Sequence, residues 1–174
     1  MRKTTQKLLV RRLVFAAAII LINILQNTRG FFPEIFGARA FLLIALVVCI
    51  GMFERKITGA LLGLFAGALW DMSIPDGSGY NALILMLFAA ACGFLITVLM
   101  RNHLLTAIIL SAAACIIYAL LYVLFFVVAA GITDSGRLLL SFYLPSVIYT
   151  VALTPVFYFA VRWLMKLTAI EEEF

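Results

Sequence analysis

Six long apolar segments follow one another along this chain, and they constrain its fold more than any other feature. A helix needs about 20 apolar residues, at about 1.5 Å each, to cross about 30 Å of hydrocarbon. Each segment is close to this length or exceeds it, and short polar interruptions separate them. The sequence therefore predicts an all-α membrane protein with one transmembrane domain, residues 1–174, whose six spans lie at about 8–25, 36–53, 57–72, 81–100, 104–131 and 138–167.

The composition excludes a soluble domain. Of the 174 residues, 66% are apolar and only 12% are charged, whereas soluble domains average roughly 45–50% apolar and about 25% charged residues. So few charges cannot cover a surface that faces water. Three cysteines also make no disulfide scaffold.

Two of the predicted spans depart from a simple straight helix. The second carries Gly37 and Arg39 near its start, so that end is either interfacial, with a snorkelling arginine, or part of a short, tilted helix. The sixth is long and contains Pro145 and Pro155, each of which removes a backbone donor. There we expect an interfacial first turn followed by a helix kinked near Pro155.

The positions of the basic residues predict the orientation. With the N-terminus inside, ten of the thirteen Lys and Arg residues fall in inner segments, as the positive-inside rule requires. We therefore predict an inner-membrane protein with both termini in the cytoplasm. The net charge of +5 is then a topology signal and indicates no nucleic-acid partner. A cytoplasmic basic rim, able to touch a filament or anionic lipid heads, is formed by Arg11, Arg12, Arg55, Lys56 and Arg101.

Groups that carry chemistry are sparse in this sequence. Its single histidine, His103, is expected in a tight inner turn, and its three cysteines fall on separate predicted helices. The sequence contains none of the common catalytic motifs and no metal-ligand spacing. We therefore predict that the chain is not an enzyme and has no catalytic residues, no metal site and no cofactor.

Glycines at every fourth position mark the third span. Gly59, Gly63 and Gly67 recur at this spacing, and Asp71 continues the series. In a helix of about 3.6 residues per turn, such positions form a slowly spiralling ridge, and glycines on it let another backbone approach closely. The ridge predicts a tight helix-packing interface, either inside the bundle or with a partner. The plain alternative is that small residues are common in membrane helices.

A polar corner follows this ridge on the predicted outer side. Facing lipid, Asp71 would cost roughly a few kcal/mol, so we expect it to have polar neighbours. Three roles stay open: it caps the loop that follows, it contacts a partner or a second helix, or it binds a substrate or proton. In the outer turn, Gly77 and Gly79 are expected to supply backbone freedom for a tight return, and Asn81 to cap the next helix.

These residues resemble the signature of a known family, the bacterial rod shape-determining proteins MreD. Members carry a glycine-rich helix that ends in Asp, a short turn with Gly, and a Gly-x-Asn-Ala-Leu-like start of the next helix, which here is Gly79-Tyr80-Asn81-Ala82-Leu83. The resemblance implies a non-enzymatic membrane scaffold of the cell-elongation machinery that makes peptidoglycan. It also implies its partners: a bitopic MreC-like protein, the actin-like MreB filament, RodA and penicillin-binding protein 2.

The same resemblance implies a compact bundle similar to the substrate-binding subunits of energy-coupling-factor transporters. That kinship supplies an alternative function, a substrate-binding membrane subunit of a small-molecule (vitamin) transporter. The alternative predicts a ligand pocket open to the outside, whereas the scaffold predicts association with peptidoglycan synthesis. The sequence lacks an obvious polar, aromatic-lined loop for a vitamin.

Overall fold

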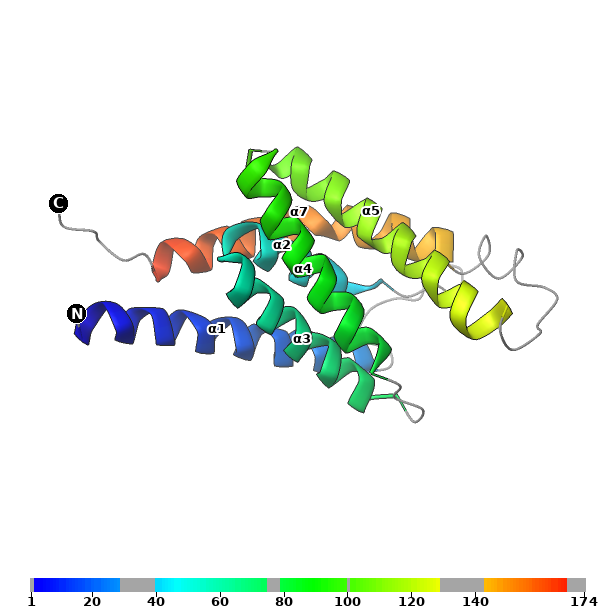
Figure 1. The fold of residues 1–174 in the computed structure, drawn as a ribbon, viewed down its shortest axis with the longest axis horizontal. Coiled ribbons are helices and arrows are strands. Elements are labelled where there is room, and N and C mark those ends of the chain that lie inside the picture. Colours follow the sequence, from blue (N-terminus) through cyan, green and yellow to red (C-terminus); the bar gives the residue numbers. More distant parts are fainter. Residues whose placement is uncertain (1, 29–39, 75–78, 100, 129–142, 169–174) are drawn as a thin grey trace.

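A computed structural model describes residues 2–28, 40–74, 79–99, 101–128 and 143–168. In these ranges the chain forms helices and no strand, and the prediction of an all-α protein is confirmed there. The helices pack side by side into an elongated bundle (Figure 1). Their bounds are α1 (Arg2–Asn27), α2 (Leu42–Phe53), α3 (Lys56–Met72), α4 (Tyr80–Val98), α5 (Leu104–Tyr122), a π-helical segment η1 (Val123–Val128) and α7 (Leu144–Leu167).

Some predictions fall on residues outside the described ranges. They concern the start of the second span, the outer turn after α3, the last residue of the fourth span, the end of the fifth span and the start of the sixth. The positions are 36–39, including Gly37 and Arg39, then 75–78, including Gly77, and finally Met100, 129–131 and 138–142.

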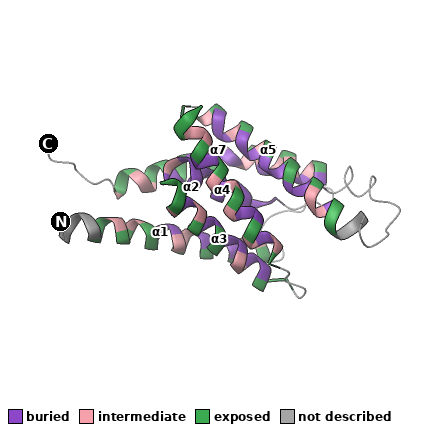
Figure 2. Cartoon of the chain, viewed as in Figure 1, coloured by how far each residue is buried: buried purple, intermediate pink, exposed green. Residues whose placement is uncertain are grey.

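Four helices in the described part are long and apolar enough to cross a membrane: Gln6–Asn27, Tyr80–Val98, Leu104–Phe125 and Leu144–Leu167. α3, with 17 residues, and α2, with 12, are shorter. Large apolar side chains stay exposed on the outer faces of the long helices. Figure 2 marks exposed residues along α1, at the edge of the bundle. Such faces suit hydrocarbon, because lipid tails are as apolar as the side chains that meet them.

Helix α2 occupies the centre of the bundle. It contacts α1, α3, α4, α5 and α7, and every residue from Leu42 to Met52 is buried. A helix that is apolar on all sides is expected to be buried on all sides. Because 12 residues extend only about 18 Å, α2 by itself is too short to cross about 30 Å of hydrocarbon.

Helix α2 is shorter than the second predicted span. Helix α2 begins at Leu42, whereas Ala40 and Phe41 are buried but not helical. The bounds of the predicted span 36–53 stay a prediction, and the short length of α2 fits the alternative of a short helix.

Side chains from two other helices hold the start of α2. Phe41 N–H donates to Thr150 Oγ1 at 2.8 Å, and Leu43 N–H donates to Gln26 Oε1 at 3.0 Å. The first N–H groups of a helix have no intrahelical acceptor. The polar partners from α1 and α7 therefore satisfy backbone N–H groups at the start of α2, deep inside an apolar bundle.

The last two helices each have an irregular feature. α5 runs directly into the π-helical η1, so the helical stretch continues to Val128. α7 has Pro145 in its first turn, where the missing N–H has no bond to lose. It continues without interruption through Pro155, and the kink expected there stays a prediction.

The two ends of the bundle differ in composition. The start of α1, the α2–α3 turn, the α4–α5 turn and the end of α7 lie at one end in Figure 1, which we call the basic end. An ion pair between Arg11 and Glu54 joins two of these segments. At the opposite end, Asn23 Nδ2 donates to Ser73 Oγ at 3.3 Å and links α1 to the α3–α4 turn.

Candidate functional site

The glycine ridge of α3 lies against α4 of the same chain. Gly59, Gly63 and Gly67 are buried, and α3 with α4 is the most extensive helix pair that the structure describes. A Cβ atom at Gly63 would lie 2.5 Å from the backbone oxygen of Leu85, and one at Gly67 would overlap the backbone of Asn81. Backbone atoms of a packed helix cannot swing aside, so only glycine permits this approach.

Gly51 and Gly93, which lie outside the predicted ridge, extend this packing to α2. A Cβ atom at Gly51 would lie 2.6 Å from the Ala89 oxygen, and one at Gly93 would lie 3.1 Å from the Gly51 oxygen. Gly59 of α3 packs against the same part of α2, because a Cβ atom at Gly59 would lie 3.3 Å from the Gly51 Cα. Ala89 and Gly93 form a small-xxx-small pair on α4, and this spacing is the signal that could have revealed them.

Asp71 holds the start of α4 with both carboxylate oxygens. Oδ1 accepts from Asn81 Nδ2 at 3.0 Å and from the Asn81 N–H at 3.3 Å, and Oδ2 accepts from the Ala82 N–H at 2.9 Å. The residue is buried, with 8% of its surface exposed. A carboxylate is stabilised at a helix N-terminus by the open N–H groups and by the helix dipole. Of the roles considered, this geometry fits contact with a second helix.

Asn81 links α4 to α5. Its Oδ1 accepts from Tyr118 Oη at 2.8 Å, and only 3% of its surface is exposed. The expectation that Asn81 caps α4 is wrong, because Gly79 occupies the cap position, with a φ of 73°, and Asp71 supplies the capping oxygens from another helix. A φ of this sign favours glycine. Gly77, the other glycine predicted in this turn, lies outside the described residues.

Tyr118 and five other aromatic residues form one group of contacting rings. Trp70 stacks on its ring with centroids 5.5 Å apart and an interplanar angle of 15°, and Phe41 lies at 5.4 Å. We call the group the aromatic cluster; it comprises Phe41, Trp70, Tyr80, Tyr118, Tyr122 and Tyr143. Tyr118 and Tyr122 lie four residues apart on α5, whereas the other four rings come from separate parts of the chain, so only the fold brings the group together beside Asp71.

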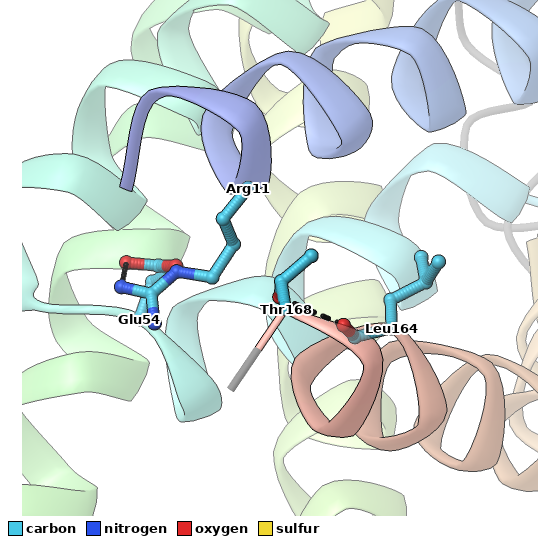
Figure 3. A network of polar contacts seen from close by, with 4 residues as sticks. All are labelled: Arg11, Glu54, Leu164 and Thr168. Carbon is cyan, nitrogen blue, oxygen red and sulfur yellow. Dashed lines mark hydrogen bonds and ion pairs between the residues drawn. The ribbon is translucent and has the colours of Figure 1, made fainter. Parts of the chain in front are cut away.

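The residues predicted as a basic rim divide into two kinds. Arg11 is engaged: its Nε lies 2.5 Å from Glu54 Oε1, and its Nη2 donates to Glu54 Oε2 at 3.3 Å (Figure 3). The Glu54 side chain is almost fully buried, so this pair fastens α1 to the α2–α3 turn. Figure 3 also shows the end of α7 near by, where Thr168 Oγ1 donates to the Leu164 carbonyl at 2.8 Å. Exposed at the basic end are Arg12, Arg55, Lys56 and Arg101.

The polar groups at the α3–α4 corner serve the chain itself. Both oxygens of Asp71 and the side-chain oxygen of Asn81 accept hydrogen bonds from the protein. Within the described ranges, no group of three or more His, Cys, Asp or Glu side chains is placed to hold a metal ion. The arrangement is suited to fixing the positions of α3, α4 and α5.

Apolar helices of spanning length, joined by glycine contacts and buried hydrogen bonds, define a multi-pass helical membrane protein. Comparison with protein families identifies its kind, because the family model for rod shape-determining protein MreD matches residues 3–168. The chain belongs to the MreD family, as the sequence signature suggested, and the family implies a role in determining rod shape. No curated protein and no solved structure gives a match.

Proposed function

We propose that this chain is a non-enzymatic scaffold of the bacterial cell-elongation machinery, built as one six-span bundle in the inner membrane. The bonding of Asp71 and Asn81 is the observation that carries the proposal. These polar residues of the family signature direct their hydrogen bonds to α4 and α5. A carboxylate fixed in this way holds the helices in register, and both its oxygens already accept hydrogen bonds from the protein.

Six crossings and an inward basic end are supported by the arrangement of the helices. α3 and α4 form a hairpin, and α1 begins at the same end of the bundle at which α7 finishes. An even number of crossings would produce this arrangement. The exposed cations Arg12, Arg55, Lys56 and Arg101 lie at that end, and the positive-inside rule then assigns it to the cytoplasm.

The proposed partners are those of the elongation machinery: an MreC-like bitopic protein, the MreB filament, RodA and penicillin-binding protein 2. The exposed basic side chains at the cytoplasmic end would face the filament, while exposed apolar helix faces would meet membrane-embedded partners or lipid. Membership of the family supports this set, since the family is described by rod shape determination.

The alternative function, a substrate-binding membrane subunit of a small-molecule transporter, is favoured by one observation. The aromatic cluster lies beside Asp71, and aromatic rings with a few polar groups are typical of small-molecule sites. In the structure these rings pack on one another, and Tyr118 is 3% exposed. Helix packing is therefore the better-supported role for the cluster.

Copurification separates the two functions. The tagged chain is extracted from its native membrane in mild detergent, and bound proteins and small molecules are identified by mass spectrometry. We expect a bitopic membrane protein together with a peptidoglycan synthase. An ATPase-linked coupling subunit, or a stoichiometric small molecule with no synthesis partner, would refute the scaffold and support the transporter.

A further inference from the structure

Two adjoining clefts lie beside α7 at the basic end. The first has a volume of about 500 Å³, and its lining includes His103, Leu104, Tyr158 and Arg162. The second has a volume of about 480 Å³ and is lined by Phe159, Arg162, Trp163 and Lys166. Phe159 and Arg162 line both, so the two join into one depression, which we call the α7 cleft.

The inner part of the α7 cleft is polar and held in place by hydrogen bonds. Tyr158 Oη donates to the backbone oxygen of Asn102 at 3.3 Å, and Asn102 Nδ2 donates to the Met52 carbonyl at 3.3 Å. These bonds fix the α4–α5 turn against α7 and against the end of α2. α5 begins in the cleft at Leu104 without a side-chain cap, and the open N–H groups of a helix start add a partial positive charge.

The outer part of the α7 cleft carries two cations. Arg162 and Lys166 are four residues apart, so they lie on the same side of α7, and both are exposed. Glu54 is the only acidic side chain described at this end, and it is paired with Arg11. Among the described residues, the positive charge of the cleft is therefore not neutralised by a carboxylate.

An apolar track leads away from these cations along α7. Phe159, Val156 and Ile148 are 54%, 62% and 63% exposed. From Phe159 to Ile148 the helix rises about 16 Å, which is close to half of the roughly 30 Å hydrocarbon thickness. Trp163, 60% exposed, lies at the level of the cations, where tryptophan prefers the boundary between hydrocarbon and water.

We propose that the α7 cleft binds an anionic phospholipid of the leaflet that contacts the basic end. The phosphodiester oxygens accept from the guanidinium of Arg162, whose fork suits two oxygens, and from Lys166. One acyl chain lies along Phe159 and Val156 and ends near Ile148. Basic pockets at helix ends are typical sites for anionic head groups. The site requires a membrane but no elongation partner, so it stands or falls separately from the scaffold proposal.

Fluorescence quenching in reconstituted vesicles tests this site. The full-length chain is placed in phosphatidylcholine vesicles with increasing amounts of phosphatidylglycerol brominated near the head-group end of its acyl chains. The chain has two tryptophans, so the signal of Trp163 is the difference between the native protein and Trp163→Phe. We expect phosphatidylglycerol to quench Trp163 at a mole fraction about 25-fold lower than brominated phosphatidylcholine, since each cation near the surface contributes about fivefold.

Matched variants separate the cleft from the general charge of this end. Arg162→Gln with Lys166→Gln should abolish most of the preference, whereas Arg12→Gln with Arg55→Gln, which removes the same charge outside the cleft, should change it by less than about twofold. Native mass spectrometry of the detergent-extracted protein should show phosphatidylglycerol retained by the native chain and by the second pair only.

Three outcomes would overturn the proposal. One is equal quenching of Trp163 by the two lipids, which would mean that the cleft selects no head group. Another is displacement by inorganic phosphate beyond that by chloride at equal ionic strength, which would identify a soluble anion as the occupant. The third is a preference that appears only after Glu171, Glu172 and Glu173 are changed to Gln, which would make the acidic tail the natural occupant.

Discussion

Replacing Gly63 with alanine tests the close contact between α3 and α4. The new Cβ would lie 2.5 Å from the Leu85 oxygen, whereas ordinary contacts begin at 3.4 Å. To move the new Cβ from 2.5 Å to the ordinary contact distance of 3.4 Å, the two helices must separate by about 0.9 Å. Overpacking of this kind costs about 1–3 kcal/mol. This cost opposes the higher helix propensity of alanine, which stabilises a helix interior by about 1 kcal/mol relative to glycine.

Gly59→Ala is the matched control for this prediction. It makes the same change four residues earlier on the ridge, where the Cβ would lie 3.3 Å from the Gly51 Cα and a shift of about a tenth of an ångström relieves it. The helix-propensity gain is common to both variants and cancels between them. We therefore expect Gly63→Ala to be less stable than Gly59→Ala by about 1–3 kcal/mol.

Reversible unfolding in mixed micelles measures this difference. The purified chain is titrated with sodium dodecyl sulfate and followed by tryptophan fluorescence and circular dichroism. In cells, Gly63→Leu should go further and abolish rod shape. Equal stability of Gly63→Ala and Gly59→Ala, with normal cell shape in Gly63→Leu, would refute the role given to the ridge.

Three further predictions concern buried polar contacts, each measured in the same unfolding assay. Asp71→Asn should cost about 1–3 kcal/mol, because an amide that still accepts from Asn81 turns its NH₂ group toward the Ala82 N–H; an unchanged stability would contradict the capping geometry. Arg11→Met should cost about 3 kcal/mol, since it leaves Glu54 buried without its cation, and adding Glu54→Met should recover most of this loss; no recovery would mean that the pair is not coupled. Tyr118→Phe should cost about 1 kcal/mol through its lost hydrogen bond to the corner, and a neutral result would place that hydroxyl outside the network.

The all-helical fold and the close helix packing could be predicted, because both follow from patterns between residues that are near one another in the sequence. Apolar runs of about 20 residues indicate membrane helices irrespective of what they pack against. The four-residue spacing of Gly59, Gly63 and Gly67 indicates a close approach, although it does not show which helix approaches. The structure supplies that helix, α4, and shows that the neighbour in sequence is also the neighbour in space.

Features that depend on distant residues could not be predicted. The late start of α2 depends on acceptors from Gln26 and Thr150, and neither is close to it in sequence. The sequence places Arg11 in the basic rim because its partner, Glu54, lies 43 residues away. From the sequence around it, an arginine near the start of a membrane helix is expected at the membrane surface. In the folded chain, Arg11 instead pairs with the buried carboxylate of Glu54.

The glycine ridge and Asp71 form one device, because they act on the same stretch of α4. Gly67 brings α3 against the backbone of Asn81 and Ala82. Asp71 follows four residues later, about 6 Å along the helix, and its oxygens accept from these same two residues. The ridge therefore sets the distance between the helices, and the carboxylate sets their register. In a bilayer, apolar burial does not favour one helix neighbour over another, so contacts of this kind have to provide the specificity. This explains why a chain with few charges has a carboxylate at the end of the glycine-rich helix α3. Both oxygens of that carboxylate hold the start of the next helix, α4.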